Sequence, residues 1–329
     1  MMINFSYAFV PLSWAVDIVP SLIHLPHWFP GASFKKTAKE WRKTTDQALN
    51  VPYNFVMNQM SSGVNRPSYV ASHIEQSSKN NDGSKPSQED IDAVKASAAI
   101  LYGGGADTTV SSIMSFILAM IVSPEVQKKA QAEIDRVVGS DRLPGFEDQE
   151  CLPYVNALAK EAHRWMPVVP ITTTHVTQEE LIYAGYRIPK GSYLIPNTWW
   201  LLHDPEVYEN PSLFDPERFI EPRNEPDPTD YAFGYARRVC PGRYLAEDSI
   251  FITLARLLAV FTMDKAVDEN GNEIEVEIDA MPGLISHPVD FAYSIKPRSC
   301  KHVEMVREAE KEHPWEESDA GQLEWDRAV

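Results

Sequence analysis

The longest stretch of this chain with helical patterning runs over residues 87–123 without a proline, and it constrains the fold more than any other feature. Ser87 stands three residues before Asp90, a spacing typical of the start of a helix. At 1.5 Å per residue the helix would be about 50 Å long. Because few helices in globular domains reach that length, we expect this one to cross a whole domain.

Composition excludes several classes of protein. The chain has 329 residues, 43% of them hydrophobic, which is enough to build a core and excludes a wholly disordered chain. Its 47 acidic and 30 basic side chains give a net charge of −17, which disfavours a nucleic-acid partner because a basic face would be needed. Cys151, Cys240 and Cys300 are too few for a disulfide framework and favour a reducing compartment.

Two apolar segments could be mistaken for membrane or targeting segments. The N-terminal one carries Pro11, Asp17 and Pro20 and lacks a basic start, so it is a poor signal peptide and a poor spanning helix. Residues 98–122 have Asp107 in the middle, which is costly at the centre of a bilayer. We therefore predict no membrane span, and expect the aromatic N-terminal segment to cover a pocket or to rest on a membrane surface.

The rest of the chain is read as mainly helix with a smaller strand portion. We expect further helices over residues 34–59, 124–139, 154–165 and 242–263, a hairpin within 172–196, and strand-like alternation over 281–297. Residues 77–87 read as a solvated loop, and 204–228 as a proline-rich but ordered coil that buries its aromatic residues. Residues 301–329 have nine acidic and four basic side chains without an apolar period, which predicts a disordered or weakly helical acidic tail.

Cys240 is the residue with the strongest chemical signal. It lies in a loop that leads into a helix, after Arg237 and Arg238 and before Pro241 and Gly242. Helix amides and the two arginines favour the thiolate, which can be a nucleophile, a redox thiol or a metal ligand. A buried, inert cysteine is the plain alternative. Haem would satisfy both features, with iron for the sulfur and propionates for the guanidinium groups.

This loop resembles the haem-binding cysteine loop of the cytochrome P450 family, whose pattern is Phe-x-x-Gly-x-Arg-x-Cys-x-Gly. Phe233, Arg238, Cys240 and Gly242 match the pattern, and Gly234 follows the phenylalanine. Ala236 stands where the family has glycine, a change that costs little unless the position needs a positive φ.

Two further motifs resemble the same family, in its order along the chain. Glu161-Ala-His-Arg164 looks like the Glu-x-x-Arg helix motif, in which the two charges share one helix face. Pro216-Glu-Arg-Phe219 looks like the Pro-Glu-Arg-Phe element, whose arginine joins that pair. The resemblance thus implies a structural cluster of Glu161, Arg164 and Arg218. An ordinary surface pair is the alternative reading of Glu161 and Arg164.

The long helix carries the motif that the family uses in oxygen chemistry. Gly104-Gly-Ala-Asp-Thr-Thr109 resembles the family motif Ala/Gly-Gly-x-Asp/Glu-Thr-Thr, which implies that Asp107 and Thr108 deliver protons during oxygen activation. A glycine-rich helix crossing without chemistry is the alternative. His175 lies where the family often has a basic residue for a haem propionate, although an ordinary loop histidine is nearly as good a reading.

The resemblance implies a cytochrome P450 fold, mainly α with a small β portion and lacking its N-terminal third, with residues 1–300 as the C-terminal two-thirds of the catalytic domain. It implies a haem-dependent monooxygenase with heme b on Cys240, a small apolar organic substrate, dioxygen, and NADPH-cytochrome P450 reductase as electron donor. The helix pair near residues 5–59, which includes Trp28 and Phe29, resembles the family's substrate-access lid, and this resemblance implies peripheral membrane contact.

The full-length family is expected on the cytosolic face of the endoplasmic reticulum, whereas this chain, without an anchor, is expected in the cytoplasm. The high proline content and the Phe-Pro-Gly motif of the lid resemble those of fungal family members that act in secondary metabolism. Two alternatives stay open: a non-catalytic truncated fragment that does not retain haem, and a thiol enzyme with Cys240 as nucleophile.

Overall fold

The chain forms two compact units, of which the computed structural model describes residues 2–10, 13–80 and 86–323. Unit 1 comprises Met1–Ala106 with Glu316–Val329, and unit 2 comprises Asp107–Trp315. The boundary falls within helix α5 (Gln88–Val122), which is the long helix expected from the sequence. In the described residues helices predominate and the strands form three two-stranded sheets, so the expectation of a mainly α fold with a small β portion is confirmed.

Unit 1 contains the helices before α5. These are α1 (Met2–Ala8), α2 (Ala15–Ile18), the 3₁₀ turn η1 (Pro20–His24), α3 (Ser33–Ser62) and α4 (Tyr69–Asn80). A small core of Tyr53, Val70, Ile74 and Val94 joins α3, α4 and the first turns of α5. The expected helix start forms, because the amide of Asp90 donates to the Ser87 hydroxyl and the amide of Ser87 donates to the Asp90 carboxylate.

Helix α4 was not expected. It includes residues 77–80, where the sequence predicted a loop, and the remaining part of that loop at residues 81–85 lies outside the described residues. Tyr69 explains part of the difference, since its hydroxyl donates to Ser97 and ties the start of α4 to α5. Pro11, on which part of the N-terminal prediction rested, also lies outside the described residues.

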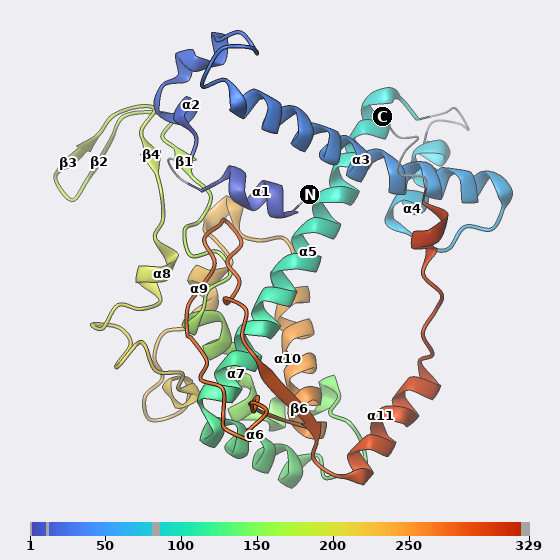
Figure 1. Ribbon diagram of the computed structural model, residues 1–329, viewed down its shortest axis with the longest axis vertical. Coiled ribbons are helices and arrows are strands. Elements are labelled where there is room, and N and C mark those ends of the chain that lie inside the picture. The colour runs from blue at the N-terminus through green and yellow to red at the C-terminus, as the bar shows by residue number, and fades with distance from the viewer. Residues whose placement is uncertain (1, 11–12, 81–85, 324–329) are drawn as a thin grey trace. The chain divides into compact units, whose positions relative to one another are not determined.

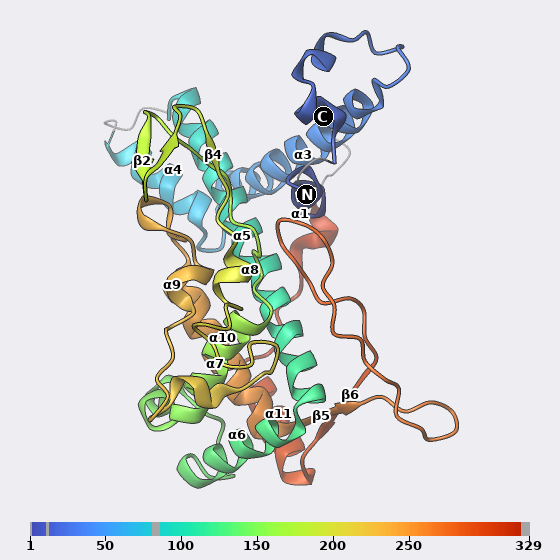
Figure 2. The same ribbon diagram turned by 90° about the vertical axis from the view of Figure 1, so that its left-hand side faces the viewer.

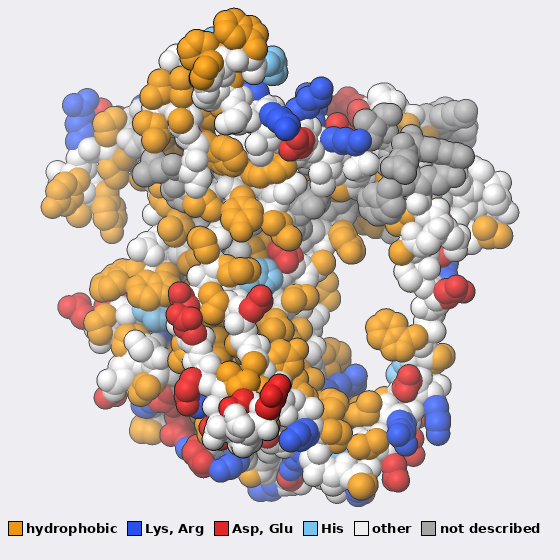
Figure 3. Space-filling model, viewed as in Figure 1, with side chains coloured by type: hydrophobic (Ala, Val, Ile, Leu, Met, Phe, Trp, Pro, Cys, Tyr) orange, Lys and Arg blue, Asp and Glu red, His pale blue; other side chains and the backbone are white. Residues whose placement is uncertain are grey.

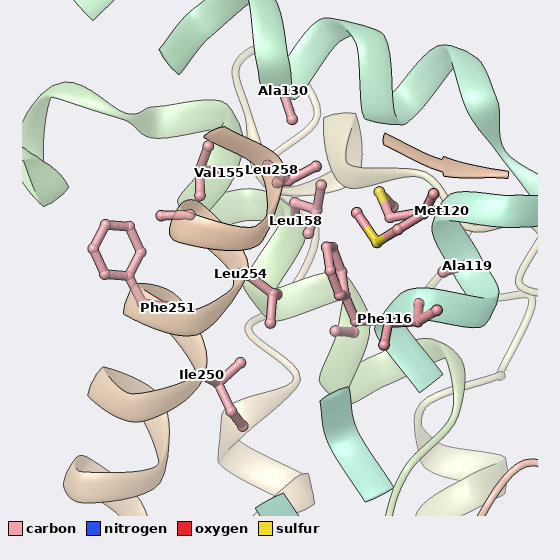
Figure 4. Packing of buried hydrophobic residues seen from close by; sticks show 14 of the residues in the cluster. Phe116, Ala119, Met120, Ala130, Val155, Leu158, Ile250, Phe251, Leu254 and Leu258 are labelled. Carbon is pink, nitrogen blue, oxygen red and sulfur yellow. The ribbon is translucent and has the colours of Figure 1, made fainter. Parts of the chain in front are cut away.

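Unit 2 is built around the C-terminal half of α5. The helices α6 (Pro124–Val137), α7 (Pro153–Trp165) and α10 (Arg243–Val260) pack there, and both ribbon views place α7 beside α10 (Figures 1 and 2). In the packing view (Figure 4) Phe116 lies close to Leu254 and Leu158, and all three side chains are fully buried. The short helix η2 (Phe146–Cys151) leads into α7.

The middle of unit 2 has little regular structure, as expected. The strands β1 (His175–Val176) and β4 (Tyr193–Leu194) pair, and β2 (Leu181–Tyr183) and β3 (Tyr186–Ile188) form the expected hairpin. The following coil holds α8 (Thr198–Leu201) and η3 (Pro216–Phe219), and it buries Tyr208 and Phe214. After it come α9 (Thr229–Ala232) and η4 (Ala236–Arg238), which lead to α10.

The end of the α10 region corrects the sequence analysis. Residues 261–263, which were expected to end the helix, instead begin β5 (Phe261–Lys265). This strand pairs with β6 (Tyr293–Pro297), the only regular strand in the expected 281–297 segment. The side chain of Gln127 on α6 donates to the carbonyl of Met263 and accepts from its amide. Strand pairing and this side chain together outweigh the helical spacing of the sequence.

The acidic tail is also more ordered than expected. Helix α11 (Cys300–Glu312) follows β6, and its residues His302 and Met305 are buried, one turn apart. These two positions form a short buried face on a helix whose other residues are mostly charged. A last 3₁₀ turn, η5 (Asp319–Gln322), belongs to unit 1, and residues 324–329 lie outside the described residues.

Exposed apolar side chains gather on the N-terminal segment of unit 1. Hydrophobic side chains cover the upper part of Figure 3, over α2 and the segment that follows it, and Trp28 is 81% exposed. In the part of the chain that the structure describes, α5 is the one helix long and apolar enough to cross a membrane, and half of its most apolar window is buried. A core helix has the same properties, so this is weak evidence for a span.

Candidate functional site

The loop that carries Cys240 is closed on itself directly before α10. The amide of Cys240 donates to the carbonyl of Phe233 at 2.7 Å, and Gly242 is the residue before the first turn of the helix. Gly234 has a φ of +82°, and a Cβ there would lie 3.3 Å from the carbonyl oxygen of Arg238. The closed loop therefore requires a glycine at 234, and it leaves the Cys240 side chain exposed.

Ala236 occupies the left-handed region of backbone space, with a φ of +47°. This is the condition under which the replacement of the family's glycine by alanine has a cost. An L-residue in this conformation brings its Cβ close to the following carbonyl, which costs about 1–2 kcal/mol. The Cys240 loop thus contains a strained residue.

Phe233 seats the loop on helix α7. Its ring packs edge-on against His163, with 5.1 Å between the ring centroids, and the guanidinium of Arg243 lies 5.9 Å from the ring centroid of Phe233. His163 is 8% exposed, and burial lowers the pKa of its imidazole to about 4. The histidine is therefore neutral at pH 7 and acts as an aromatic support for the loop.

The polar groups of this region fit haem. Cys240 presents an exposed sulfur, and the neighbouring guanidinium groups of Arg237 and Arg238 are exposed, with no hydrogen-bond or ion-pair partner within the described ranges. On β1 the Nδ1 atom of His175 is buried and has no hydrogen-bond partner in the described part of the chain. A thiolate for iron and cationic or N–H groups for carboxylates are the donors that haem with its propionates requires.

Glu161, Arg164 and Arg218 form one buried cluster. Arg164 donates to both carboxylate oxygens of Glu161, at 2.7 and 2.8 Å, and the Nε of Arg218 donates to Glu161 at 3.3 Å. The carboxylate also accepts from the amide of Asp215 at 2.8 Å. All three charged residues are fully buried. Burial raises the pKa of the Glu161 carboxyl, and the two guanidinium groups oppose that shift.

This cluster ties the proline-rich coil to α7. Arg164 donates to the carbonyls of Leu202 and Leu213, and Arg218 donates to those of Glu209 and Asn210. Each guanidinium thereby pairs with the carboxylate and satisfies carbonyl groups of a coil that has few regular backbone hydrogen bonds. The coil is therefore held in place by the side chains of Arg164 and Arg218, which supply hydrogen bonds that a β-sheet would otherwise provide.

Asp107 and Thr108 lie on α5 at the start of unit 2, and both side chains are half-buried. The Oδ1 atom of Asp107 lies 3.3 Å from Nε2 of His287, a residue on the loop before β6. No pattern in the sequence points to His287, because 180 residues separate it from Asp107 and no local motif joins them. Within the described residues, no hydrogen bond or ion pair links Asp107 or His175 to the Cys240 loop.

The chain combines a mainly helical fold with an exposed cysteine on a loop before a helix, and comparison with known proteins identifies the family. Residues 12–290 match the family model for cytochrome P450, and the chain belongs to that family. The structure is similar to that of a zebra fish cytochrome P450 solved with abiraterone, at a TM-score of 0.63 and 26% identity, covering 91% of this chain and 69% of the other.

Fungal proteins are among the similar sequences. The chain is 50% identical to the cytochrome P450 monooxygenase CLM2 of Gibberella zeae, over 100% of this chain and 62% of that protein. It is 48% identical to the multifunctional cytochrome P450 monooxygenase af510 of Aspergillus fumigatus, over 97% and 60%, and 40% identical to an O-methylsterigmatocystin oxidoreductase of Aspergillus flavus, over 96% and 59%. The chain thus spans about three fifths of the length of these relatives.

Proposed function

We propose that this chain carries the haem-thiolate part of a monooxygenase that inserts one oxygen atom of dioxygen into a small apolar organic substrate. The observation that carries the proposal is the exposed thiol of Cys240, on a closed loop at the start of α10, in a chain that belongs to the cytochrome P450 family. The names of the fungal relatives support a substrate from secondary metabolism.

In this proposal the chain's residues have separate roles. The Cys240 thiolate would be the protein ligand of the haem iron, and Arg238 and His175 would bind the propionates of heme b. Phe233, Gly234 and Gly242 keep the sulfur accessible by closing the loop behind it. The bound haem would supply the activation of dioxygen, which no protein side chain can provide.

Asp107 and Thr108 are the proton-handling residues of the proposal. A carboxylic acid and a hydroxyl that follow each other on a helix can hold a water molecule and pass a proton through it. Both side chains are half-buried, so that they exchange protons with solvent while they remain fixed in the helix. Glu161, Arg164 and Arg218 keep their structural role.

The partners follow from the same function. Electrons would come from NADPH-cytochrome P450 reductase at the cytosolic face of the endoplasmic reticulum. The exposed apolar side chains of the N-terminal segment, such as Phe5, Phe9 and Trp28, suit peripheral contact with that membrane.

The proposal is tested by purifying the chain with added haemin and recording the spectrum of its reduced, carbon-monoxide-bound form. We expect the red-shifted Soret band of a thiolate ligand, and its loss in Cys240→Ser but not in Cys300→Ser, since Cys300 is also exposed. A colourless protein would overturn the proposal and favour the fragment that does not retain haem. Alkylation of Cys240 that abolishes an activity without any chromophore would favour the thiol enzyme.

A further inference from the structure

His287 is placed against Asp107 by a tightly connected loop. Its Nε2 atom lies 3.3 Å from the Asp107 carboxylate, and the two side chains are 23% and 27% exposed. Both belong to unit 2, although they are 180 residues apart. The two groups form an ion pair when the imidazole is protonated, and partial burial strengthens such a pair relative to one in open water.

Ser286, the residue before His287, anchors the loop in this position. The hydroxyl of Ser111, four residues after Asp107 and on the same face of α5, donates to the carbonyl of Ser286 at 2.5 Å. The amide of Ser286 donates to the carbonyl of Val168 at 2.8 Å, and Ser286 is 5% exposed. Position 286 is therefore fixed from two sides.

The loop is also closed on itself on either side of His287. The carbonyl of His287 accepts from the amide of Met281 at 2.7 Å, Ala280 and Pro288 form a bridge, and Ile285 is buried. A residue with fixed neighbours and a bonded carbonyl has little backbone freedom, so the imidazole is presented to Asp107 in one place. Such a fixed loop distinguishes the contact of His287 with Asp107 from a chance surface pair, and it is typical of a side chain that supports a reactive group.

We propose that His287 is the positioning residue for Asp107, an inference that rests on the function proposed above. A carboxyl group that passes protons must keep one orientation, because small displacements of a reacting group can lower a rate by about 100-fold. The imidazole holds Oδ1 on the side of the loop and leaves the other carboxylate oxygen available. His287 thus acts through Asp107.

The contact itself is tested without catalysis, by amide hydrogen exchange of residues 279–289. We expect Asp107→Asn to raise exchange in this segment several-fold, and a double-mutant cycle of Asp107→Asn with His287→Leu to show a coupling of about fivefold in the unfolding constant. Asp290→Asn is the matched control, since Asp290 is an exposed carboxylate on the same loop. Unchanged exchange and additive effects would overturn the proposal.

The positioning role is tested in the haem-loaded chain with reductase, by oxidation of 7-ethoxycoumarin. We expect His287→Leu to lower kcat by about 10- to 100-fold with an unchanged KM. His287→Gln keeps an N–H donor, so it should retain most of kcat. Equal kcat in the wild type and both variants would overturn the positioning role. A chain without the thiolate spectrum would overturn the proposed function, and the exchange measurement would still decide whether His287 holds Asp107.

Discussion

Ala236 shows how one side chain can limit the stability of the Cys240 loop. Its φ is +47°, where glycine has no steric cost. We predict that Ala236→Gly raises the free energy of unfolding by about 0.5–1 kcal/mol, because the relief of strain exceeds the added freedom of the unfolded chain. Urea unfolding followed by circular dichroism measures it. Ala246→Gly, in α10, should lower the same quantity by about 1 kcal/mol, and an equal sign for both variants would contradict the argument.

His163 makes stability depend on pH in the acid range. Burial lowers the pKa of its imidazole from 6.5 to about 4. The unfolded chain therefore binds more protons between these values, and the free energy of unfolding falls as pH falls from 6.5 to 4, by about 3 kcal/mol from this group. His163→Leu should reduce that slope in unfolding experiments at several pH values. An unchanged slope in His163→Leu would contradict the argument.

At the scale of elements, the cluster around Glu161 joins helix α7 to the proline-rich coil. Glu161→Gln would leave Arg164 and Arg218 buried with reduced compensation. We predict a loss of about 3–5 kcal/mol in the free energy of unfolding. Glu206→Gln, at an exposed carboxylate of the same coil, should change it by less than about 0.5 kcal/mol, and similar values for both variants would argue against the cluster's role.

Gln127 connects α6 to β5 through two hydrogen bonds to the backbone of Met263, at 2.9 and 2.8 Å. Gln127→Leu would leave the buried amide and carbonyl of Met263 without these partners, so we predict a loss of about 2 kcal/mol. Gln131 makes one such bond, to the carbonyl of Phe261, and Gln131→Leu should cost about half as much. Thermal and urea unfolding of both variants give the comparison. Equal losses would show that packing, not hydrogen bonding, decides the effect.

The elements that the sequence predicted correctly are those with strong local signals. Helix α5 has a capping box, and α6 ends at Val137, two residues before Gly139, whose φ is +83°. Strand β5 was assigned to helix because its apolar residues continue the spacing of α10, while its real partner, β6, lies about thirty residues further on. Local spacing cannot report such pairing. Two buried residues in a charged segment, His302 and Met305, were likewise too few to predict α11.

At the scale of the whole molecule, haem binding should be visible as stability. A ligand that binds only the folded chain, at a free concentration 100 times its Kd, adds about 2.7 kcal/mol to the free energy of unfolding. We predict that haemin has this effect on the wild type and on Cys300→Ser, and a smaller one on Cys240→Ser. Urea unfolding with and without haemin measures the difference. An equal gain in Cys240→Ser would mean that haemin binds elsewhere.

The candidate site was predictable where residues of one motif also act together in space. The Cys240 loop is a single local segment, and Glu161 and Arg164 lie one turn apart on α7. His287 shows the limit of this approach. Its contact with Asp107 depends on a loop that Ser111 and Ser286 hold in place, and this can be seen only in three dimensions.

The two glutamines of α6 also bear on how copies of this chain meet one another. β5 pairs with β6 on one side. On its other side the carbonyl of Phe261 accepts from Gln131, and both backbone groups of Met263 are bonded to Gln127. An open strand edge is a template on which another chain can add a strand. Such pairing can be the first step toward insoluble aggregates. Because amide side chains occupy the place of that extra strand, we expect α6 to hinder self-association through this ribbon.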